Sequence, residues 1–151
     1  MKSVAKFEKV SRIQFEESLI GVDMYFADQT IDTIYNDLLL PQRVTTKSAG
    51  YNFYLPYDII IYPGNSVTIP TCIKCNIEEG YVLQLYIKSG LSFKYGLQLA
   101  NSVGVIDSDY YFSRNEGHII AKLVNTGLKP VTLFEGQPFM QGVFTQFFIA
   151  N

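Results

Sequence analysis

The residue pattern changes after Pro41, and this change constrains the fold more than any other feature of the sequence. From there the chain breaks into short apolar or alternating runs, such as IIIYPGNSVTIP and HIIAKLVNTGLKPVTLF, separated by turn residues. Glycines recur near the spacing expected for the turns of a sandwich or barrel. No repeat or linker interrupts this rhythm. We therefore predict one all-β domain over residues 1–151.

The residues before Pro41 have a different pattern. Their alternation predicts a first strand over residues 3–10, after which Ser11 and Gln14 have the spacing of a capping box and predict a short helix. Helical spacing of apolar residues predicts a second helix over residues 28–40, ended by the following proline. Residues 11–40 are therefore expected to form a helical insertion in the β domain.

Composition narrows the function classes. A chain of 151 residues can bury about two-thirds of its unfolded surface around one core. The net charge of −2 argues against a nucleic-acid or anionic-membrane partner, which would need clustered Lys and Arg. Hydrophobic residues make up 48%, a surplus that a subunit interface could bury. The N-terminus lacks a signal-peptide pattern and no run could span a bilayer, so we expect a cytoplasmic protein.

Two residue types that often carry chemistry have modest roles here. Cys72 and Cys75 form a C-x-x-C in an apparent strand, where the two thiols would point to opposite faces. With one histidine and no further cysteine, a zinc site lacks ligands, so two reduced strand cysteines are expected. His118 is predicted to be a strand residue, because no nucleophile motif accompanies it.

Residues 88–110, KSGLSFKYGLQLANSVGVIDSDY, place several chemical groups close together in sequence. Lys88 puts a positive charge beside the Ser89 hydroxyl and the unobstructed backbone N–H of Gly90, which together suit an anionic oxygen such as that of a phosphate. The same residues would also fit an ordinary loop between strands. The sequence that follows is needed to decide between these interpretations.

A predicted hairpin and a carboxylate come next. Gly104 lies between two β-branched residues, which suits a hairpin tip that needs a positive φ or a close approach of the backbone to a ligand. Asp107 offers a carboxylate that could act as a general base. Asp109 is expected in a turn or a subunit contact. Tyr110, taken alone, would be a plain aromatic strand residue.

The order KSGL and then NSVGVIDSDY resembles the second and third motifs of the trimeric dUTPase family (deoxyuridine triphosphate nucleotidohydrolases), and KSAGYNF at 47–53 resembles the first. The resemblance spans roughly residues 40–145. It implies a jelly-roll-like β fold and hydrolysis of dUTP to dUMP and pyrophosphate. It also implies a homotrimer whose active sites are assembled from different subunits.

The resemblance also assigns roles to residues. It makes Asp107 the base for the water that attacks the α-phosphorus, and it places Tyr110 under the deoxyribose, where the ring leaves no room for a 2′-hydroxyl. It implies a uracil-binding hairpin, made of Asn101, Gly104, Val105 and Ile106. It implies a group of phosphate-binding residues, made of Lys88, Ser89, Gly90 and Gln141.

The sequence departs from the family pattern at several positions. Lys88 stands where Arg is usual and loses the bidentate fork. Asn52 replaces an Asp near the expected magnesium site, so we expect no direct protein ligand and Mg²⁺ bound mainly through the substrate phosphates. The fourth motif reads EGQPFMQ, in which only Gly136 and Gln141 match.

Two departures concern whole segments. The segment between Tyr110 and Gly117 is longer than usual, and Arg114 in it is expected to be a solvated loop charge. The glycine-rich fifth motif, which closes over the triphosphate, is expected to be absent, because the sequence ends FFIAN. Either the chain is a shortened one, or the protein has no lid of its own.

Two alternatives remain beside dUTP hydrolysis. A non-catalytic or regulatory protein that binds deoxyuridine nucleotides is compatible with Asn52 and the missing fifth motif. A dCTP deaminase would share the fold and need a catalytic glutamate, for which Glu116 is available, although the sequence IDSDY favours attack of water on phosphorus. Release of pyrophosphate, of ammonia, or of neither distinguishes the three.

Overall fold

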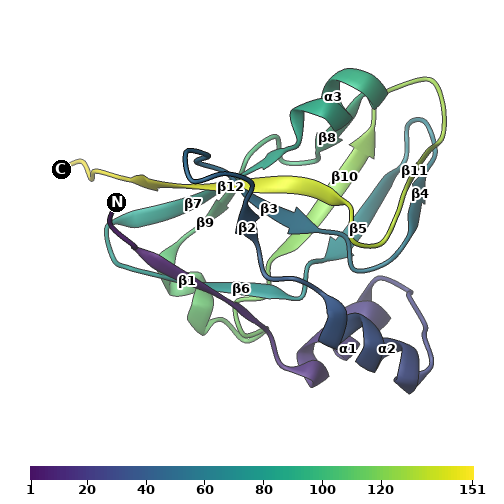
Figure 1. Cartoon of the computed structure of the whole chain (residues 1–151), viewed down its shortest axis with the longest axis horizontal. Helices are drawn as coiled ribbons and strands as arrows, with labels where there is room; N and C mark the ends of the chain where they lie inside the picture. The colour runs from purple at the N-terminus through teal and green to yellow at the C-terminus, as the bar shows by residue number, and fades with distance from the viewer.

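The computed structural model describes all residues from 1 to 151 and consists mainly of short strands (Figure 1). The elements are β1 (Ala5–Lys9), α1 (Arg12–Gly21), α2 (Asp28–Asp37), β2 (Gln42–Arg43), β3 (Tyr51–Tyr54), β4 (Ile59–Ile61), β5 (Ser66–Pro70), β6 (Ile73–Ile77), β7 (Tyr81–Ile87), α3 (Ser89–Tyr95), β8 (Leu97–Leu99), β9 (Gly104–Ile106), a 3-10 helix η1 (Ser108–Phe112), β10 (Ile120–Asn125), β11 (Val131–Leu133) and β12 (Pro138–Gln146). The predicted all-β, jelly-roll-like class is confirmed.

The strands pair into four small sheets. The largest has the order β2-β3-β12-β7-β9, with β12 at its centre and β9 at one edge. A second sheet has the order β5-β10-β8, and the pairs β1-β6 and β4-β11 complete the set. All the pairings are antiparallel and most join segments far apart in sequence. The last strand, β12, therefore pairs with both β3 and β7 and forms the centre of the largest sheet (Figure 1).

A single apolar core lies between the sheets and beneath the helices. Phe53, Leu83 and Phe139 are fully buried members from three strands of the largest sheet. Phe7 of β1 packs edge-on against Phe53, with ring centroids 5.7 Å apart, and joins the β1-β6 pair to this sheet. Such aromatic pairs stabilise by about 0.5–1.5 kcal/mol beyond the area that they bury.

The predicted helical insertion is present, and its two helices lie together at one end of the β domain (Figure 1). The Ser11 hydroxyl accepts a hydrogen bond from the backbone N–H of Gln14 at 3.1 Å and begins α1, as the capping pattern predicts. The predicted end of α2 at Leu40 is wrong. The helix ends at Asp37, where Leu38 turns extended and the Lys9 ammonium donates to the carbonyl of Tyr35 at 2.5 Å.

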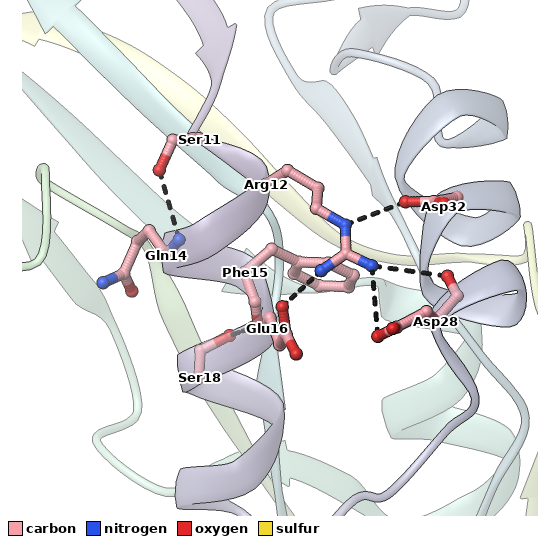
Figure 2. Close-up of polar contacts among 8 residues, drawn as sticks. All are labelled: Ser11, Arg12, Gln14, Phe15, Glu16, Ser18, Asp28 and Asp32. Carbon is pink, nitrogen blue, oxygen red and sulfur yellow. Dashed lines mark hydrogen bonds and ion pairs between the residues drawn. The ribbon is translucent and has the colours of Figure 1, made fainter.

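An arginine joins the two helices. Arg12 donates to the Asp32 carboxylate at 2.8 Å and to the backbone carbonyl of Asp28 at 3.3 Å, and it pairs with Glu16 on its own helix (Figure 2). These carboxylates are largely exposed, so the network is screened by solvent and is weakly stabilising.

The C-x-x-C segment differs from the prediction. Cys72 precedes β6 and has a φ of 68°, so only Cys75 lies in a strand, and the expected alternation of the two thiols across one strand is wrong. Both side chains are buried, free thiols, and burial raises the pKa of each to about 12. They are therefore inert members of the core. No helix in the structure is long and apolar enough to cross a membrane.

Candidate functional site

All four predicted phosphate-binding residues lie near the end of β7. Lys88 follows β7, and its ammonium donates to the Asn52 side-chain oxygen of β3 at 2.8 Å. Gln141 of β12 lies directly opposite Asn52 in the register, and its side-chain oxygen lies over Gly50, where a Cβ atom would approach to 2.3 Å. Ser89 follows Lys88 and is exposed. We call Asn52, Lys88, Ser89, Gly90 and Gln141 the polar cluster.

The KSGL segment is more regular than a loop. Ser89 is the first residue of the helix α3 and Lys88 is its N-cap, so the interpretation as a loop between strands is wrong. Gly90, in the first turn, has nothing within 4 Å of the position of a Cβ atom. The hydroxyl of Ser89 makes no hydrogen bond within the chain, and the Lys88 ammonium uses one of its three donors on Asn52. The cluster thus keeps unused donors that face solvent.

The hairpin needs its glycine for a reason beyond the predicted ones. Gly104 does not have a positive φ; the left-handed residue at the tip is Ser102, with φ 64°. A Cβ atom on Gly104 would lie 2.9 Å from the Cβ of Leu85 on β7, so the packing of β9 against the core already requires a glycine here. A close approach of this backbone to a ligand stays a prediction. Since β9 is an edge strand, the backbone groups of this strand that face away from β7 are free to bind another molecule.

Asp107 and Tyr110 follow the hairpin. Asp107 is exposed, its carboxylate makes no hydrogen bond within the chain, and its carbonyl accepts from the backbone N–H of Tyr110 at 3.1 Å as η1 begins. Tyr110 is half-buried, and its hydroxyl donates to the His118 carbonyl at 2.6 Å. Asp109 lies in η1 and is exposed, in agreement with the predicted turn. Arg114 is exposed, as expected of a solvated loop charge.

The single chain does not bring Asp107 to the polar cluster. The β7-β9 register pairs Leu83 with Ile106 and Leu85 with Gly104, so Asp107 continues toward Val82 while Lys88 lies at the other end of β7. At about 3.3 Å per residue, the two ends are roughly 20 Å apart. The hairpin tip therefore lies at the end of β7 nearer the cluster, and Asp107 lies at the opposite end.

Sequence reasoning missed the contacts of two residues near Tyr110. His118 is not in a strand: it precedes β10, is fully buried, and bonds Gln14 and Cys72 through its two ring nitrogens. The carboxylate of Glu116 accepts from the backbone N–H and the hydroxyl of Ser11 at 2.8 and 2.5 Å, which occupies the residue considered for deamination. Both contacts cross more than 100 residues, so no local signal could have revealed them.

The chain does not form a metal site of its own. No group of three or more His, Cys, Asp or Glu side chains lies close enough to hold an ion. Asn52, at the position that the resemblance placed near magnesium, is buried and its side-chain oxygen already accepts from Lys88. These residues do not fit a protein-held Mg²⁺, and an ion here would have to arrive with its own oxygen ligands.

Comparison with known proteins identifies the domain. A family model described as dUTPase matches residues 36–150. The deoxyuridine 5'-triphosphate nucleotidohydrolase of Lactococcus lactis is 40% identical over 113 residues, which cover 74% of this chain and 75% of that protein. The corresponding protein of Desulfitobacterium hafniense is 39% identical over 115 residues, covering 74% and 73%.

Solved structures agree and include the helical region. The crystal structure of dUTPase from Streptococcus mutans matches with a TM-score of 0.73 and 35% identity, covering 96% of this chain and 98% of that one. A dUTPase from phage phi11 of S. aureus matches with a TM-score of 0.71 at 17% identity, covering 99% and 94%, and shares the fold. The similarity thus extends from the motifs to the β topology, and the chain belongs to the dUTPase family.

Proposed function

We propose that this chain hydrolyses dUTP to dUMP and pyrophosphate, with Asp107 activating the water that attacks the α-phosphorus. The observation that carries the proposal is the exposed, unpaired carboxylate of Asp107 directly between the edge strand β9 and Tyr110. A carboxylate that is free of other partners and open to solvent can accept a proton from a bound water. The names of the L. lactis and D. hafniense relatives support this substrate.

Nucleoside selection is assigned to the hairpin and Tyr110. The free backbone edge of Gly104, Val105 and Ile106, supported by Asn101, would bind the polar edge of uracil. A site built from fixed donors and acceptors rejects a mismatched base strongly, because its own polar groups would be left unpaired. The half-buried ring of Tyr110 would contact the deoxyribose and exclude a 2′-hydroxyl.

The polar cluster is assigned to the phosphates. The Lys88 ammonium, the Ser89 hydroxyl and the backbone of Gly90 supply donors to phosphate oxygens, and the side chain of Gln141 lies beside them. Magnesium enters as part of the substrate, chelated by the phosphates, because the chain lacks a ligand set. A structural Mg(II) ion is named for the phage phi11 enzyme, which makes a role for this ion testable here.

We propose a homotrimer as the active form. Asp107 and Lys88 lie at opposite ends of β7, so within one chain the proposed base is far from the proposed phosphate-binding residues. A closed C₃ ring would place the hairpin and Asp107 of one subunit beside the polar cluster of the next. Exposed apolar side chains on the surface, among them Val105 at 58%, would be partly covered by such an interface.

One assay tests the function and its alternatives. Purified protein is given dUTP, dCTP and UTP with Mg²⁺, and the release of pyrophosphate and of ammonia is followed, while native mass spectrometry gives the oligomeric mass. Pyrophosphate from dUTP alone is expected, from a trimer. Ammonia from dCTP would indicate a deaminase, and tight binding of dUTP without product would indicate the non-catalytic alternative.

A further inference from the structure

The N-terminal helix α1 makes specific contacts with the segment that follows Tyr110. We propose that Gln14 and His118 are positioning residues, through which α1 holds the ring of Tyr110 and thereby sets discrimination against ribonucleotides. The inference rests on the proposed function, because it deepens the role of Tyr110 in that same site. We call Ser11, Gln14, Asn115, Glu116 and His118 the clamp.

The clamp begins at the hydroxyl of Tyr110. This hydroxyl donates to the His118 backbone carbonyl at 2.6 Å and accepts from the Asn115 side-chain nitrogen at 3.0 Å. The hydroxyl at the end of the ring is thus held by one hydrogen bond that it donates and one that it accepts. Any shift of the turn at residues 115–118 would move the ring with it.

That turn has an unfavourable backbone conformation. Glu116 has a φ of 65° and Gly117 a φ of 77°, two consecutive left-handed residues, and the first is not a glycine. A Cβ atom on Gly117 would lie 2.6 Å from the Cα of Tyr111. Left-handed conformations of non-glycine residues are unfavourable unless the surroundings impose them. Local hydrogen bonds, such as that from the Gly117 N–H to the Asn115 side-chain oxygen at 3.1 Å, hold the turn in part, and contacts from elsewhere in the chain add to them.

Helix α1 supplies some of these contacts. At its start, Ser11 donates through its N–H and its hydroxyl to the Glu116 carboxylate. One turn further on, the Gln14 side-chain oxygen lies 2.9 Å from the Nδ1 of His118. The reciprocal half of the capping motif is thereby made by Glu116, which leaves the side chain of Gln14 available for His118.

The imidazole of His118 has one defined arrangement. Its Nε2 accepts from the backbone N–H of Cys72 at 2.8 Å, so the proton of the neutral ring is on Nδ1 and is donated to Gln14. Burial lowers the pKa of His118 to about 4, while the nearby Glu116 carboxylate opposes that shift, so the ring is neutral at physiological pH. Without the Gln14 oxygen, a buried N–H would have no acceptor.

Two segments outside the dUTPase sequence motifs are thus in contact with each other. The dUTPase family model begins at residue 36, so all of α1 and most of α2 lie outside it. The segment after Tyr110 is longer than the usual link, and its last residues are the ones that α1 contacts. The helix and the longer segment therefore act as one structural unit, because each forms hydrogen bonds with polar groups of the other.

The test uses three variants of the full-length protein. Gln14→Ala removes the acceptor for His118. Gln14→Glu keeps an acceptor at the same place. Arg12→Gln breaks the ion pairs that join α1 to α2, shown in Figure 2, and leaves every contact of the clamp in place. For each variant, kcat and KM are measured with dUTP and with UTP, and the NMR signals of the single histidine report its tautomer.

We expect Gln14→Ala to raise kcat/KM for UTP relative to dUTP by about five- to tenfold, the size of one lost buried hydrogen bond, and to shift the His118 signals. Gln14→Glu should restore most of the selectivity, and Arg12→Gln should leave it at the wild-type value. The inference is overturned if Gln14→Ala keeps wild-type selectivity, or if Arg12→Gln changes it equally. A wild-type protein without dUTP hydrolysis would overturn the proposed function first, before any variant is compared.

Discussion

The polar cluster at the end of β7 and the clamp below Tyr110 use similar residue types in opposite ways. In the clamp, the polar groups of Glu116 and His118 have partners within the chain, and His118 is fully buried. In the polar cluster, Ser89 and Gln141 make no side-chain hydrogen bond, and Lys88 makes one. Polar groups that are satisfied by the protein fix a shape, whereas groups left open on the surface are available for a ligand.

Asp107 resembles the polar cluster in that its carboxylate has no partner within the chain, and replacing it by Asn should have the largest effect. The change keeps the size of the side chain and its ability to hydrogen-bond but removes the base. We expect kcat for dUTP to fall by about 10²–10⁴-fold with little change in nucleotide affinity. Steady-state kinetics together with calorimetric binding measure both quantities. Near-normal turnover would contradict the assigned role.

Lowering the pH tests the clamp, whose polar groups have partners within the chain. Because burial depresses the pKa of His118 to about 4, the folded state resists protonation that the unfolded chain accepts near pH 6.5. The contribution of neutral His118 to the free energy of unfolding is therefore fully present above pH 6.5. It is lost as the pH falls toward 4, by about 3 kcal/mol in all. Glu116, with its pKa lowered, adds a further loss only at more acidic pH.

Urea unfolding at pH 7, 6 and 5, combined with an NMR titration of the only histidine, checks the size and the sign of this loss. The urea midpoint should fall over this interval while His118 itself stays unprotonated in the folded protein. A folded-state titration of His118 near its ordinary pKa would show that the clamp is open.

Gly104→Ala tests the packing under the hairpin, between the two regions. The new Cβ atom would meet Leu85 at 2.9 Å, and Leu85 is buried, so β9 must move away from β7. We expect a loss of about 1–3 kcal/mol in unfolding free energy and a higher KM for dUTP. Gly21→Ala is the matched control, because nothing lies within 4 Å of its Cβ position. Equal stability of both variants would remove the packing argument.

Arg12→Gln should have the smallest effect. Its carboxylate partners are exposed, so a slight fall in the thermal midpoint is expected, and most of it should vanish in 1 M salt. Differential scanning calorimetry at low and high salt measures the difference. A large fall in the thermal midpoint that does not depend on salt would mean that these ion pairs stabilise the protein more than solvent-screened surface pairs do.

The sequence predicts much of this molecule where the determinants are local. Turn spacing predicts the strands, Ser11 predicts the start of α1, and the motif around Asp107 predicts the family. The contact between Lys88 and Asn52 joins residues 36 apart and depends on strand pairing, which no local pattern fixes. The predicted positive φ of Gly104 is wrong, and its contact with Leu85 could not be predicted, because the two residues become adjacent only in the folded sheet.

The roles of individual site residues remain predictions. Asp107 and Tyr110 follow the edge strand β9, whereas the polar cluster lies at the other end of β7, and the two groups do not meet within one chain. An arrangement between subunits depends on surface complementarity, which is not encoded in the spacing of residues along one chain.

The long separation between α1 and its partner Glu116 has a consequence for synthesis on the ribosome. The two residues joined by the cap are 105 positions apart, so at about 5–20 residues per second the helix waits roughly 5 to 20 seconds for its partner to be made. An isolated helix of 10 residues is only marginally stable in water, so the α1 segment should remain largely unfolded during that interval. We expect limited proteolysis to cut α1 in nascent chains stalled before residue 116 and to spare it in longer ones.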